Sequence, residues 1–492
     1  MLIYIYIIMS SRFFITTSIA YVNAPPHIGF ALESLQADVL ARLRRQKGEE
    51  VFFLTGTDEH GAKIARAAEA AGRTPKELVD ENSEKFKKLK SALNLSWDNF
   101  IRTSDKKNHW PVAEELWERI GGAGDLYKKT YSGLYCVGHE AFVTKKDLVD
   151  GKCADHKKEP ELIEEENWFF RLSEYSKEIE KRIKKDELKI IPETRKNEIL
   201  SLFKEGLEDI SFSRPSKDLS WGAPVPGDKA QTMYVWADAL SNYISGYGGI
   251  KNWEAHPADV HLIGKDILRF HAAIWPAMLL SAKLPLPKSI FVHGHILSGG
   301  QKMSKSIGNV VDPFELVKKY GADSARYYLL REIPSSEDGD FSYEKFEDRY
   351  NGDLANGLGN FAARVLTLAE NNDNLLINEN NLDAEVDKKI KETKLLVSQK
   401  IEEFKLNEAL ELIWKLIHFG DQYVNEKKPW EKKISDEERS SIFNLVVILD
   451  NVAALLLPFL PGTSEKITIS IKSEKGILTV KKIQNLFPRL EK

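Results

Sequence analysis

Residues 12–30, RFFITTSIAYVNAPPHIGF, contain the pattern that predicts the fold class of this chain. The part from Arg12 to Val22 is rich in β-branched and aromatic residues and predicts a strand, and Asn23 to Pro26 predicts a turn. From Ala31 to Arg45, leucines and a valine recur on one helical face, which predicts a helix. A strand, a turn and a helix in this order are typical of a parallel α/β sheet.

His27 and Gly29 lie at the junction between the predicted strand and helix. Free backbone N–H groups and the helix dipole favour anions at such a junction, and a glycine leaves room for a nucleotide to approach the backbone. An imidazole in this place can donate a hydrogen bond to a phosphate oxygen. Taken alone, an ordinary loop histidine beside two prolines is the simpler interpretation.

A second candidate phosphate site is the stretch QKMSKSIGN, residues 301–309. It follows an apolar run, Ser289 to Leu297, and Ser-Gly-Gly, so we expect a flexible connection after a buried strand. Lys302 and Lys305 place two ammonium groups three residues apart, which suits the binding of a polyphosphate. An ordinary polar loop has the same composition, so other segments must decide between the two interpretations.

A candidate metal site is formed by two Cys-x2-His pairs with 13 residues between them. Cys136, His139, Cys153 and His156 can place two thiolates and two imidazoles around Zn²⁺, which prefers sulfur and nitrogen ligands in a tetrahedron. A closed site of this kind is structural rather than catalytic. The alternative is a pair of free cysteines with incidental histidines.

The composition is typical of a soluble globular protein, with 42% hydrophobic and 29% charged residues. At 492 residues the chain has room for three or four domains. Its net charge of −4 argues against a general basic nucleic-acid binder, so binding to RNA would require basic residues gathered on one face. Only two cysteines occur, so no disulfide framework is suggested.

The chain resembles class I aminoacyl-tRNA synthetases, and most closely the methionyl-tRNA synthetases, over almost its whole length. The resemblance depends on five blocks in the same order: Tyr21-Val22-Asn23-Ala24-Pro25-Pro26-His27-Ile28-Gly29, Phe53-Leu54-Thr55-Gly56-Thr57-Asp58-Glu59-His60-Gly61, Tyr234-Val235-Trp236-Ala237-Asp238-Ala239, Ile263-Gly264-Lys265-Asp266 and residues 301–309, which we call the lysine loop. Five long blocks in order are a specific signal, whereas one four-residue motif would not be.

The resemblance implies an α/β fold class: a Rossmann-like parallel-sheet catalytic domain, split by a zinc-binding connective insertion and followed by a C-terminal α-helical anticodon-binding bundle. The expected parts are 9–125 and 226–298 for the two catalytic halves, 126–225 for the insertion, 299–352 for the lysine-loop and stem-contact region, and 353–492 for the bundle.

Local patterns predict several helices within these parts. Thr74-Pro75-Lys76-Glu77 is a capping box with proline at the first helical position, so a helix is expected from there to about Leu93. Helical periodicity in the bundle predicts helices at Asp353–Asn371, Asp387–Phe419 and Glu437–Leu457.

The activity implied by the resemblance is that of a methionine-tRNA ligase, which activates L-methionine with ATP and Mg²⁺ and then transfers it to tRNA(Met). The expected catalytic residues, which would stabilise charge on phosphate oxygens, are His27, Lys302 and Lys305. The expected ATP-binding residues are His27, Gly29, Asp266, His293, Lys302, Ser304 and Lys305.

The methionine pocket is likewise implied by the resemblance. Its expected residues are Ile19, Tyr21, Asp58, Trp236, Ala239, Tyr243, Phe270 and His271. Asp58 would receive the substrate ammonium, and the aromatic rings suit a thioether. Without the resemblance, most of these side chains would be assigned to the core.

The remaining implied sites are in the insertion and the bundle. The Cys-x2-His pairs resemble the zinc knuckle of the family, where cysteines often fill all four positions. Arg214 matches an arginine near the junction of insertion and sheet, for which a surface salt bridge is the alternative. Asn407 matches an asparagine that contacts the anticodon, and an ordinary helix-surface residue is the alternative there.

The sequence departs from the family at three functional positions. Phe30 replaces a second histidine of the first motif, and a phenyl ring cannot donate a hydrogen bond to a phosphate. Leu240 replaces a proline beside the methionine pocket of some members. Glu411 replaces an arginine one turn after Asn407, and a carboxylate near RNA phosphates is unfavourable.

Two other functions remain open from the sequence. A related class I synthetase for another amino acid, such as cysteine, would keep the sheet and the lysine loop but change the pocket, which here favours methionine. A catalytically silent tRNA-binding protein derived from a synthetase is supported by Phe30 and Glu411. The intact lysine loop and Asp58 argue against it.

The resemblance also implies a cytoplasmic enzyme with no membrane association, and the lack of an appended dimerisation domain predicts a monomer. The apolar opening, Met1 to Ile8, is far shorter than the ~20 residues that cross a bilayer, and it lacks a basic flank and a cleavage site. Because the resemblance begins only near Arg12, we expect translation to start at Met9.

Overall fold

The computed structural model describes residues 11–138, 141–143, 148–154, 157–303, 308–372, 375–376, 382–430, 435–474 and 477–491. The chain forms two compact units. The first unit comprises Met1–Pro26, Glu49–Lys88 and Trp97–His293, and the second unit comprises His27–Gly48, Leu89–Ser96 and Gly294–Lys492. The expected start at Met9 lies outside the described residues.

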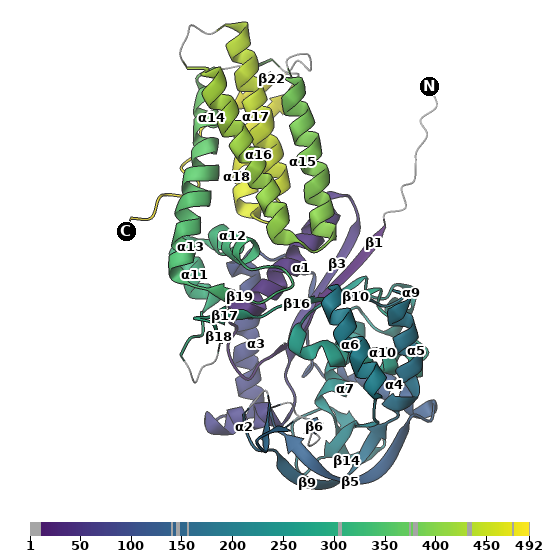
Figure 1. The fold of residues 1–492 in the computed structure, drawn as a ribbon. Coiled ribbons are helices and arrows are strands. Elements are labelled where there is room, and N and C mark those ends of the chain that lie inside the picture. Colours follow the sequence, from purple (N-terminus) through teal and green to yellow (C-terminus); the bar gives the residue numbers. More distant parts are fainter. Residues whose placement is uncertain are drawn as a thin grey trace, which may run out of the picture. The chain divides into compact units, whose positions relative to one another are not determined.

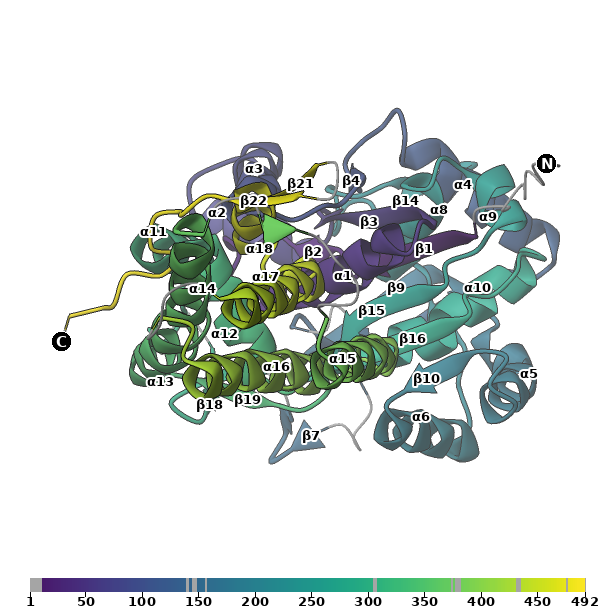
Figure 2. The same ribbon diagram turned by 90° about the horizontal axis from the view of Figure 1, so that it is seen from above.

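The first unit contains a parallel sheet in the order β10-β16-β15-β1-β3-β2, with β4 paired to β3. Its strands are β1 (Arg12–Thr17), β2 (Ala20–Tyr21), β3 (Glu50–Asp58), β4 (Asn99–Arg102), β10 (Lys189–Ile191), β15 (Val260–Gly264) and β16 (Ser289–His293). Figure 2 shows β16, β15, β1 and β3 side by side. The parallel sheet predicted from the strand, turn and helix pattern is confirmed.

Two details of this sheet differ from the prediction. The strand expected from Arg12 to Val22 is interrupted, because β1 ends at Thr17 and β2 covers only Ala20–Tyr21. The edge strand β10 lies within residues 126–225, the range expected for the insertion, and pairs in parallel with β16. Three residues are too few to show a strand period, so the sequence could not predict it.

The rest of the first unit consists of small antiparallel sheets and helices. One sheet has the order β11-β9-β5-β6, from β5 (Leu126–Cys136), β6 (Ala141–Val143), β9 (Glu161–Phe170) and β11 (Ile210–Ser211). β7 (Leu148–Val149) pairs with β8 (Lys152–Cys153), and β12 (Ser213–Pro215), β13 (Pro224–Val225) and β14 (Asp228–Met233) form a third sheet. The helices are α2 (Ala62–Ala70), α4 (Trp110–Gly122), α5 (Leu172–Lys184), α6 (Glu193–Glu205), α7 (Val235–Leu240), α8 (Asn242–Ser245), α9 (Ile250–Ala255) and α10 (Trp275–Ser281).

The predicted capping box is confirmed at the start of α3 (Pro75–Ala92). The Thr74 backbone N–H donates to the Glu77 carboxylate at 2.9 Å, and the Glu77 N–H donates to Thr74 Oγ1 at 3.3 Å. These two hydrogen bonds satisfy backbone donors that have no partner within the helix. Local sequence therefore fixes the start of this helix.

The second unit begins with α1 (Ile28–Gln46) and continues with two three-stranded sheets and a helical bundle. One sheet contains β17 (Ile296–Ser298), β18 (Gln301–Lys302) and β19 (Gly339–Phe341), and the other contains β20 (Leu375–Leu376), β21 (Ile471–Glu474) and β22 (Ile477–Val480). Helices follow as α11 (Pro313–Tyr320), α12 (Ala322–Glu332), α13 (Tyr343–Arg349), the π-helix η4 (Tyr350–Gly359), α14 (Asn360–Glu370), α15 (Ala384–Glu402), α16 (Leu406–Lys427), α17 (Asp436–Leu456) and α18 (Pro461–Ser470). Figure 1 shows α14 to α17 packed as a bundle.

The predicted helices of the bundle are confirmed at Glu437–Leu457, which is α17, and at Asp353–Asn371, which is helical through η4 and α14, whereas the third prediction is corrected. The expected helix Asp387–Phe419 is two helices, α15 and α16. The chain reverses between them at Phe404, whose φ is +59°. Phenylalanine is unusual in this backbone region, so no turn signal was present in the sequence.

One described helix, α17, is long and apolar enough to cross a membrane by length and composition alone. However, 61% of its most apolar window is buried inside the protein. It lies among α14, α15, α16 and α18, which cover its apolar residues. That degree of burial is typical of the core helix of a bundle.

Candidate functional site

The candidate phosphate site of the second unit is centred on His27, the residue that caps α1. Its Nδ1 accepts a hydrogen bond from the Gly29 backbone N–H at 3.0 Å. Because Nδ1 acts as an acceptor, the proton of the neutral ring is on Nε2. The residue is exposed as a whole, yet partial burial of its imidazole and the nearby charges of Lys302 and His295 lower its pKa. His27 is therefore a neutral donor through Nε2 near pH 7.

Gly29 is required next to this ring for steric reasons. A Cβ atom at position 29 would lie 2.7 Å from Cε1 of His27 and 3.9 Å from Cε of Met303. The first distance is too short for two carbon atoms, so a larger residue would displace the imidazole. The second distance shows that the side chain of Met303, in the lysine loop, lies next to Gly29.

The lysine loop begins as a strand rather than as a flexible connection. Gln301 and Lys302 form β18, which pairs with Leu297 and Ser298 of β17. The Lys302 side chain is exposed, and its charge acts on the imidazole of His27. The predicted residues Ser304 and Lys305 lie outside the described residues. The structure thus brings together His27, Gly29 and Lys302 of the predicted ATP site.

The candidate carboxylate of the first unit, Asp58, is the last residue of β3 and is buried. It is the register partner of Tyr21 in β2. The next residue, Glu59, accepts from Arg102 Nε at 2.7 Å and from Arg102 Nη2 at 2.9 Å. The Glu59 carboxylate is fully buried, and its bidentate ion pair with Arg102 fixes the backbone beside Asp58.

The predicted methionine pocket is an aromatic cluster in the first unit. Trp236 of α7 stacks on Phe270, with ring centroids 3.9 Å apart and an interplanar angle of 7°. Tyr243 and His271 are almost completely buried, and the Tyr243 hydroxyl lies 2.7 Å from His271 Nε2. Ala239 is buried, and Ile19 is half-buried and packs against the same core.

The tautomer of His271 follows from its two hydrogen bonds. Its Nδ1 lies 2.9 Å from the Ile267 carbonyl, which can only accept, so Nδ1 carries the proton. Nε2 then accepts from the Tyr243 hydroxyl. Burial lowers the pKa of His271 to about 4, although the carbonyl partly opposes this shift. The pocket therefore presents neutral polar groups, as an uncharged thioether side chain requires.

We predict that His271 makes the protein less stable in acid. Between pH 6.5 and pH 4 the unfolded chain binds a proton at this position and the folded protein does not, so the free energy of unfolding falls as pH falls. The full loss is on the order of 3 kcal/mol. Urea denaturation at pH 7 and pH 4 should show a smaller loss in His271→Gln than in the wild type. Equal losses would contradict the assignment.

Asp266 and His293, the other predicted ATP-binding residues, lie together at the carboxyl ends of β15 and β16. Gly264 is the register partner of His293. A Cβ atom at Gly264 would lie 3.1 Å from Asp266 Oδ1 and 3.6 Å from His293 Nε2. Ligands of open parallel sheets bind at this edge. The two side chains therefore line the edge where a nucleotide is expected.

The metal candidates are described only in part. Cys136 ends β5 and Cys153 lies in β8; both are buried, and neither forms a disulfide bond. His139 and His156 lie outside the described residues. Among the residues that the structure does describe, no group of three possible ligands is assembled. Two buried thiols in short hairpins nevertheless have the chemistry that Zn²⁺ prefers.

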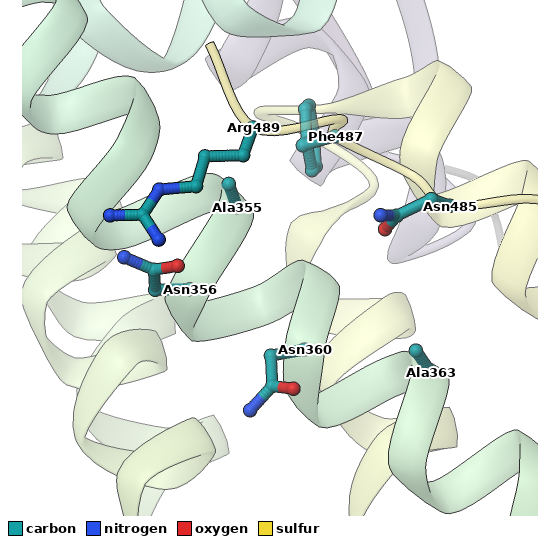
Figure 3. Close-up of a pocket in the computed structure, with 7 residues that line it drawn as sticks. All are labelled: Ala355, Asn356, Asn360, Ala363, Asn485, Phe487 and Arg489. Atoms are coloured by element: carbon teal, nitrogen blue, oxygen red, sulfur yellow. The ribbon is translucent and has the colours of Figure 1, made fainter. Parts of the chain in front are cut away.

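A cavity of about 370 Å³ in the second unit is a candidate RNA contact that the sequence did not indicate. Figure 3 shows its lining, with Asn356 and Asn360 on one helical stretch and Asn485, Phe487 and Arg489 on the C-terminal segment. Amide groups can recognise base edges, and a guanidinium can bind a phosphate. Asn407 is half-buried near the start of α16 and does not line this cavity.

Two of the sequence interpretations change with the structure. Arg214 is buried: its Nη1 donates to Ser211 Oγ at 2.6 Å, and its guanidinium lies 5.1 Å from the Tyr135 ring centroid. The ion pair considered for it does exist, with Arg214 Nε 4.0 Å from Glu165 Oε2, but both side chains are buried, so the surface location is wrong. Glu411 is 3.4 Å from Lys415, so part of its charge is neutralised within α16.

Sequence reasoning also missed a buried network of Asp238, His60 and His109. The signal was present, because Asp238 is a carboxylate within the otherwise apolar stretch Tyr234–Leu240, and His60 follows Asp58 by two residues. A charged side chain is almost never fully buried unless it is paired, so a carboxylate in an apolar stretch indicates a buried partner.

Comparisons with known proteins agree over most of the chain. The family model described as "tRNA synthetases class I (M)" matches residues 13–155 and 143–366. The model "Anticodon-binding domain of tRNA ligase" matches residues 383–487. These two matches cover both units.

Relatives and solved structures point to the same family. The "Methionine--tRNA ligase" of Brucella suis is 41% identical over 93% of this chain and 91% of its own length. That of Thermotoga maritima is 41% identical over 94% of this chain and 76% of its own length. The structure of Mycobacterium tuberculosis methionyl-tRNA synthetase with methionyl-adenylate matches with a TM-score of 0.91 and 37% identity, over 97% of this chain and 100% of that one. The chain belongs to the methionyl-tRNA synthetase family of class I tRNA synthetases.

Proposed function

We propose that this chain is a methionine-tRNA ligase that activates L-methionine with ATP and transfers it to the 3′-terminal adenosine of tRNA(Met). The observation that carries the proposal is the pocket of Trp236, Phe270, Tyr243 and neutral His271 in a member of this family. Stacked rings and uncharged polar groups suit a thioether. Charging of a tRNA(Met) transcript with labelled methionine tests the proposal; absence of charged tRNA would contradict it.

The first step is an in-line displacement at phosphorus. A carboxylate oxygen of methionine attacks the α-phosphorus of ATP, the bond to the bridging oxygen breaks, and diphosphate leaves with that electron pair. The protein must position the two substrates and stabilise charge on phosphate oxygens. We propose His27, through Nε2–H, and Lys302 for this role, and Lys305 is expected to share it; the hydrogen bond from Gly29 N–H to His27 Nδ1 and the nearby charge of Lys302 support the proposal. Mg²⁺ would accompany ATP as its counter-ion.

The second step transfers the methionyl group. A ribose hydroxyl of the terminal adenosine attacks the carbonyl carbon of methionyl-adenylate, AMP leaves, and the hydroxyl proton passes to the departing phosphate. Asp58 would hold the substrate ammonium through both steps, because its strand end is fixed by Glu59 and Arg102. Asp266 and His293 are proposed to contact the nucleotide.

We further propose one structural Zn²⁺ held by Cys136, His139, Cys153 and His156. The two buried thiols support the proposal, and a bound Zn²⁺ would stabilise the hairpins without taking part in the reaction. Elemental analysis should find about one zinc per chain, and a strong chelator should lower the melting temperature. Cys136→Ser should lose the zinc. Wild-type protein that contains no zinc after purification without chelator would contradict this proposal.

For tRNA binding we propose the cavity around Arg489, in addition to Asn407. Removal of a phosphate or base contact is expected to raise the KM for tRNA roughly tenfold, since one such contact is worth about 1–3 kcal/mol. Arg489→Ala and Asn407→Ala should each show this rise with unchanged pyrophosphate exchange. Arg439→Ala provides a matched control away from the cavity. An unchanged KM in either variant would remove that residue from the tRNA site.

The cytoplasmic location and the monomeric state stay predictions. Sedimentation at several protein concentrations tests the second.

A further inference from the structure

The short helix α7, Val235–Leu240, carries two predicted pocket residues, Trp236 and Ala239. A helix of six residues is too short to be stable by itself, because the cost of helix nucleation is offset only over longer segments. The position of its side chains must therefore be fixed by contacts with other elements. Asp238, in the same helix, is fully buried and makes the polar contacts.

The Asp238 carboxylate accepts hydrogen bonds from two histidines. Its Oδ2 lies 2.7 Å from His60 Nδ1, and its Oδ1 lies 3.0 Å from His109 Nε2. A carboxylate can only accept, so both ring nitrogens carry protons. His60 and His109 are themselves buried, at 2% and 0% exposure, and His109 Nδ1 lies 2.8 Å from the Ser245 hydroxyl.

The ionised state of Asp238 depends on these partners. Burial alone would raise the pKa of this carboxyl group, but the two imidazoles lower it below its ordinary range. A buried carboxylate that loses one partner is strongly unfavourable. The network is therefore stable only while both histidines keep their positions.

The elements joined by Asp238 are those that carry the candidate amino-acid site. His60 follows Asp58 by two residues, and Glu59, between them, is held by Arg102. Ser245 belongs to α8, Asn242–Ser245, which also contains Tyr243. One carboxylate thus connects Asp58 at the end of β3 with the aromatic side chains of α7 and α8.

We propose that Asp238 is a positioning residue for the methionine pocket, which fixes α7 relative to Asp58 by accepting hydrogen bonds from His60 and His109. Asp238 does not itself contact the substrate. The inference rests on the proposed methionine-tRNA ligase function, because it concerns the part of that active site that binds methionine. It predicts that loss of either hydrogen bond weakens methionine binding and leaves ATP binding unchanged.

The test compares variants that remove a donor with variants that keep it. Leucine at position 60 or 109 has no donor. Asparagine at 60 places an amide N–H near the position of Nδ1, and glutamine at 109 places one near Nε2. In pyrophosphate exchange, His60→Leu and His109→Leu are expected to raise the KM for methionine roughly tenfold, the effect of one lost hydrogen bond to a charged group. The KM for ATP should change less than about twofold, and His60→Asn and His109→Gln should recover most of the methionine affinity.

Asp259→Asn is the matched control in the same unit. Asp259 Oδ2 also accepts from a histidine, His256 Nε2 at 3.0 Å, and from the Phe14 backbone N–H at 2.7 Å. It precedes β15, at the amino end of that strand, whereas Asp58 lies at the carboxyl end of β3. This variant should lower stability and leave the ratio of the two KM values unchanged, which separates positioning from general destabilisation.

Each outcome decides between the proposals. A selective rise in the methionine KM that the amide variants reverse supports the positioning role. Equal rises in the KM values for methionine and ATP, or no rise in either, would overturn the positioning role. Methionine-dependent exchange by the wild type would still support the proposed function. Wild-type protein without methionine-dependent exchange would refute both. If His60→Leu does not fold, as judged by circular dichroism, His109→Leu tests the other oxygen of the same carboxylate.

Discussion

Replacing His27 by asparagine is expected to lower the rate of methionine-dependent pyrophosphate exchange about 10²–10³-fold, the usual cost of removing one donor that stabilises a transition state. His27 has two separable roles. Its Nδ1 accepts from the Gly29 N–H and caps α1, whereas its Nε2–H is the donor proposed for the phosphate. Asparagine can accept the same backbone hydrogen bond but has no donor at the position of Nε2.

The matched variant is His27→Gln, whose longer side chain carries an amide N–H near the position of Nε2. It should retain more activity than His27→Asn at equal thermal stability. Rates are measured at saturating methionine and ATP, so that weaker binding does not obscure the chemical step. An asparagine variant within about threefold of the wild type would mean that His27 only caps the helix.

The second large effect concerns stability: Arg326→Met is expected to lower the free energy of unfolding by about 3–5 kcal/mol, as for other broken buried ion pairs. Arg326 is fully buried in α12, and its Nη2 lies 2.8 Å from Asp38 Oδ2 of α1. Its Nε donates to the Phe459 carbonyl at 2.6 Å, and its Nη1 donates to that of Leu93 at 3.0 Å. One guanidinium therefore joins α1, the segment before Trp97 and the segment between α17 and α18.

The control for this prediction is an exposed ion pair of the same unit. Lys391 and Asp387 lie 2.7 Å apart on α15, and the Lys391 side chain is 73% exposed. Lys391→Met should cost less than about 1 kcal/mol, because solvent screens exposed pairs. Urea denaturation followed by circular dichroism compares the two variants. If Arg326→Met costs no more than Lys391→Met, the buried network does not stabilise the second unit.

The features that could be predicted from the sequence are those that depend on neighbouring residues. The strand, turn and helix around His27, the capping box at Thr74 and the apolar helix α17 all follow local patterns. These patterns reflect backbone propensities and periodic burial, which a single sequence displays directly. The family resemblance added the order of the parts and the candidate pocket residues.

The features that could not be predicted depend on residues far apart in the chain. Asp38 and Arg326 are 288 positions apart, and His60 and Asp238 are 178 positions apart. No local periodicity indicates such pairs, and the sequence does not show whether a charged residue is buried or exposed. Arg214 illustrates the point, because its sequence context was equally compatible with the surface. The turn at Phe404 was missed since the chain has no glycine or proline there.

Activation of methionine by this chain is tested by ATP–pyrophosphate exchange with each of the twenty amino acids separately. ATP labelling is expected with methionine and none above background with cysteine or the others, because the aromatic pocket around His271 is uncharged and suits a thioether. Exchange with another amino acid instead of methionine would contradict the assigned pocket. Exchange with none would contradict the activation chemistry and favour a catalytically silent tRNA-binding protein.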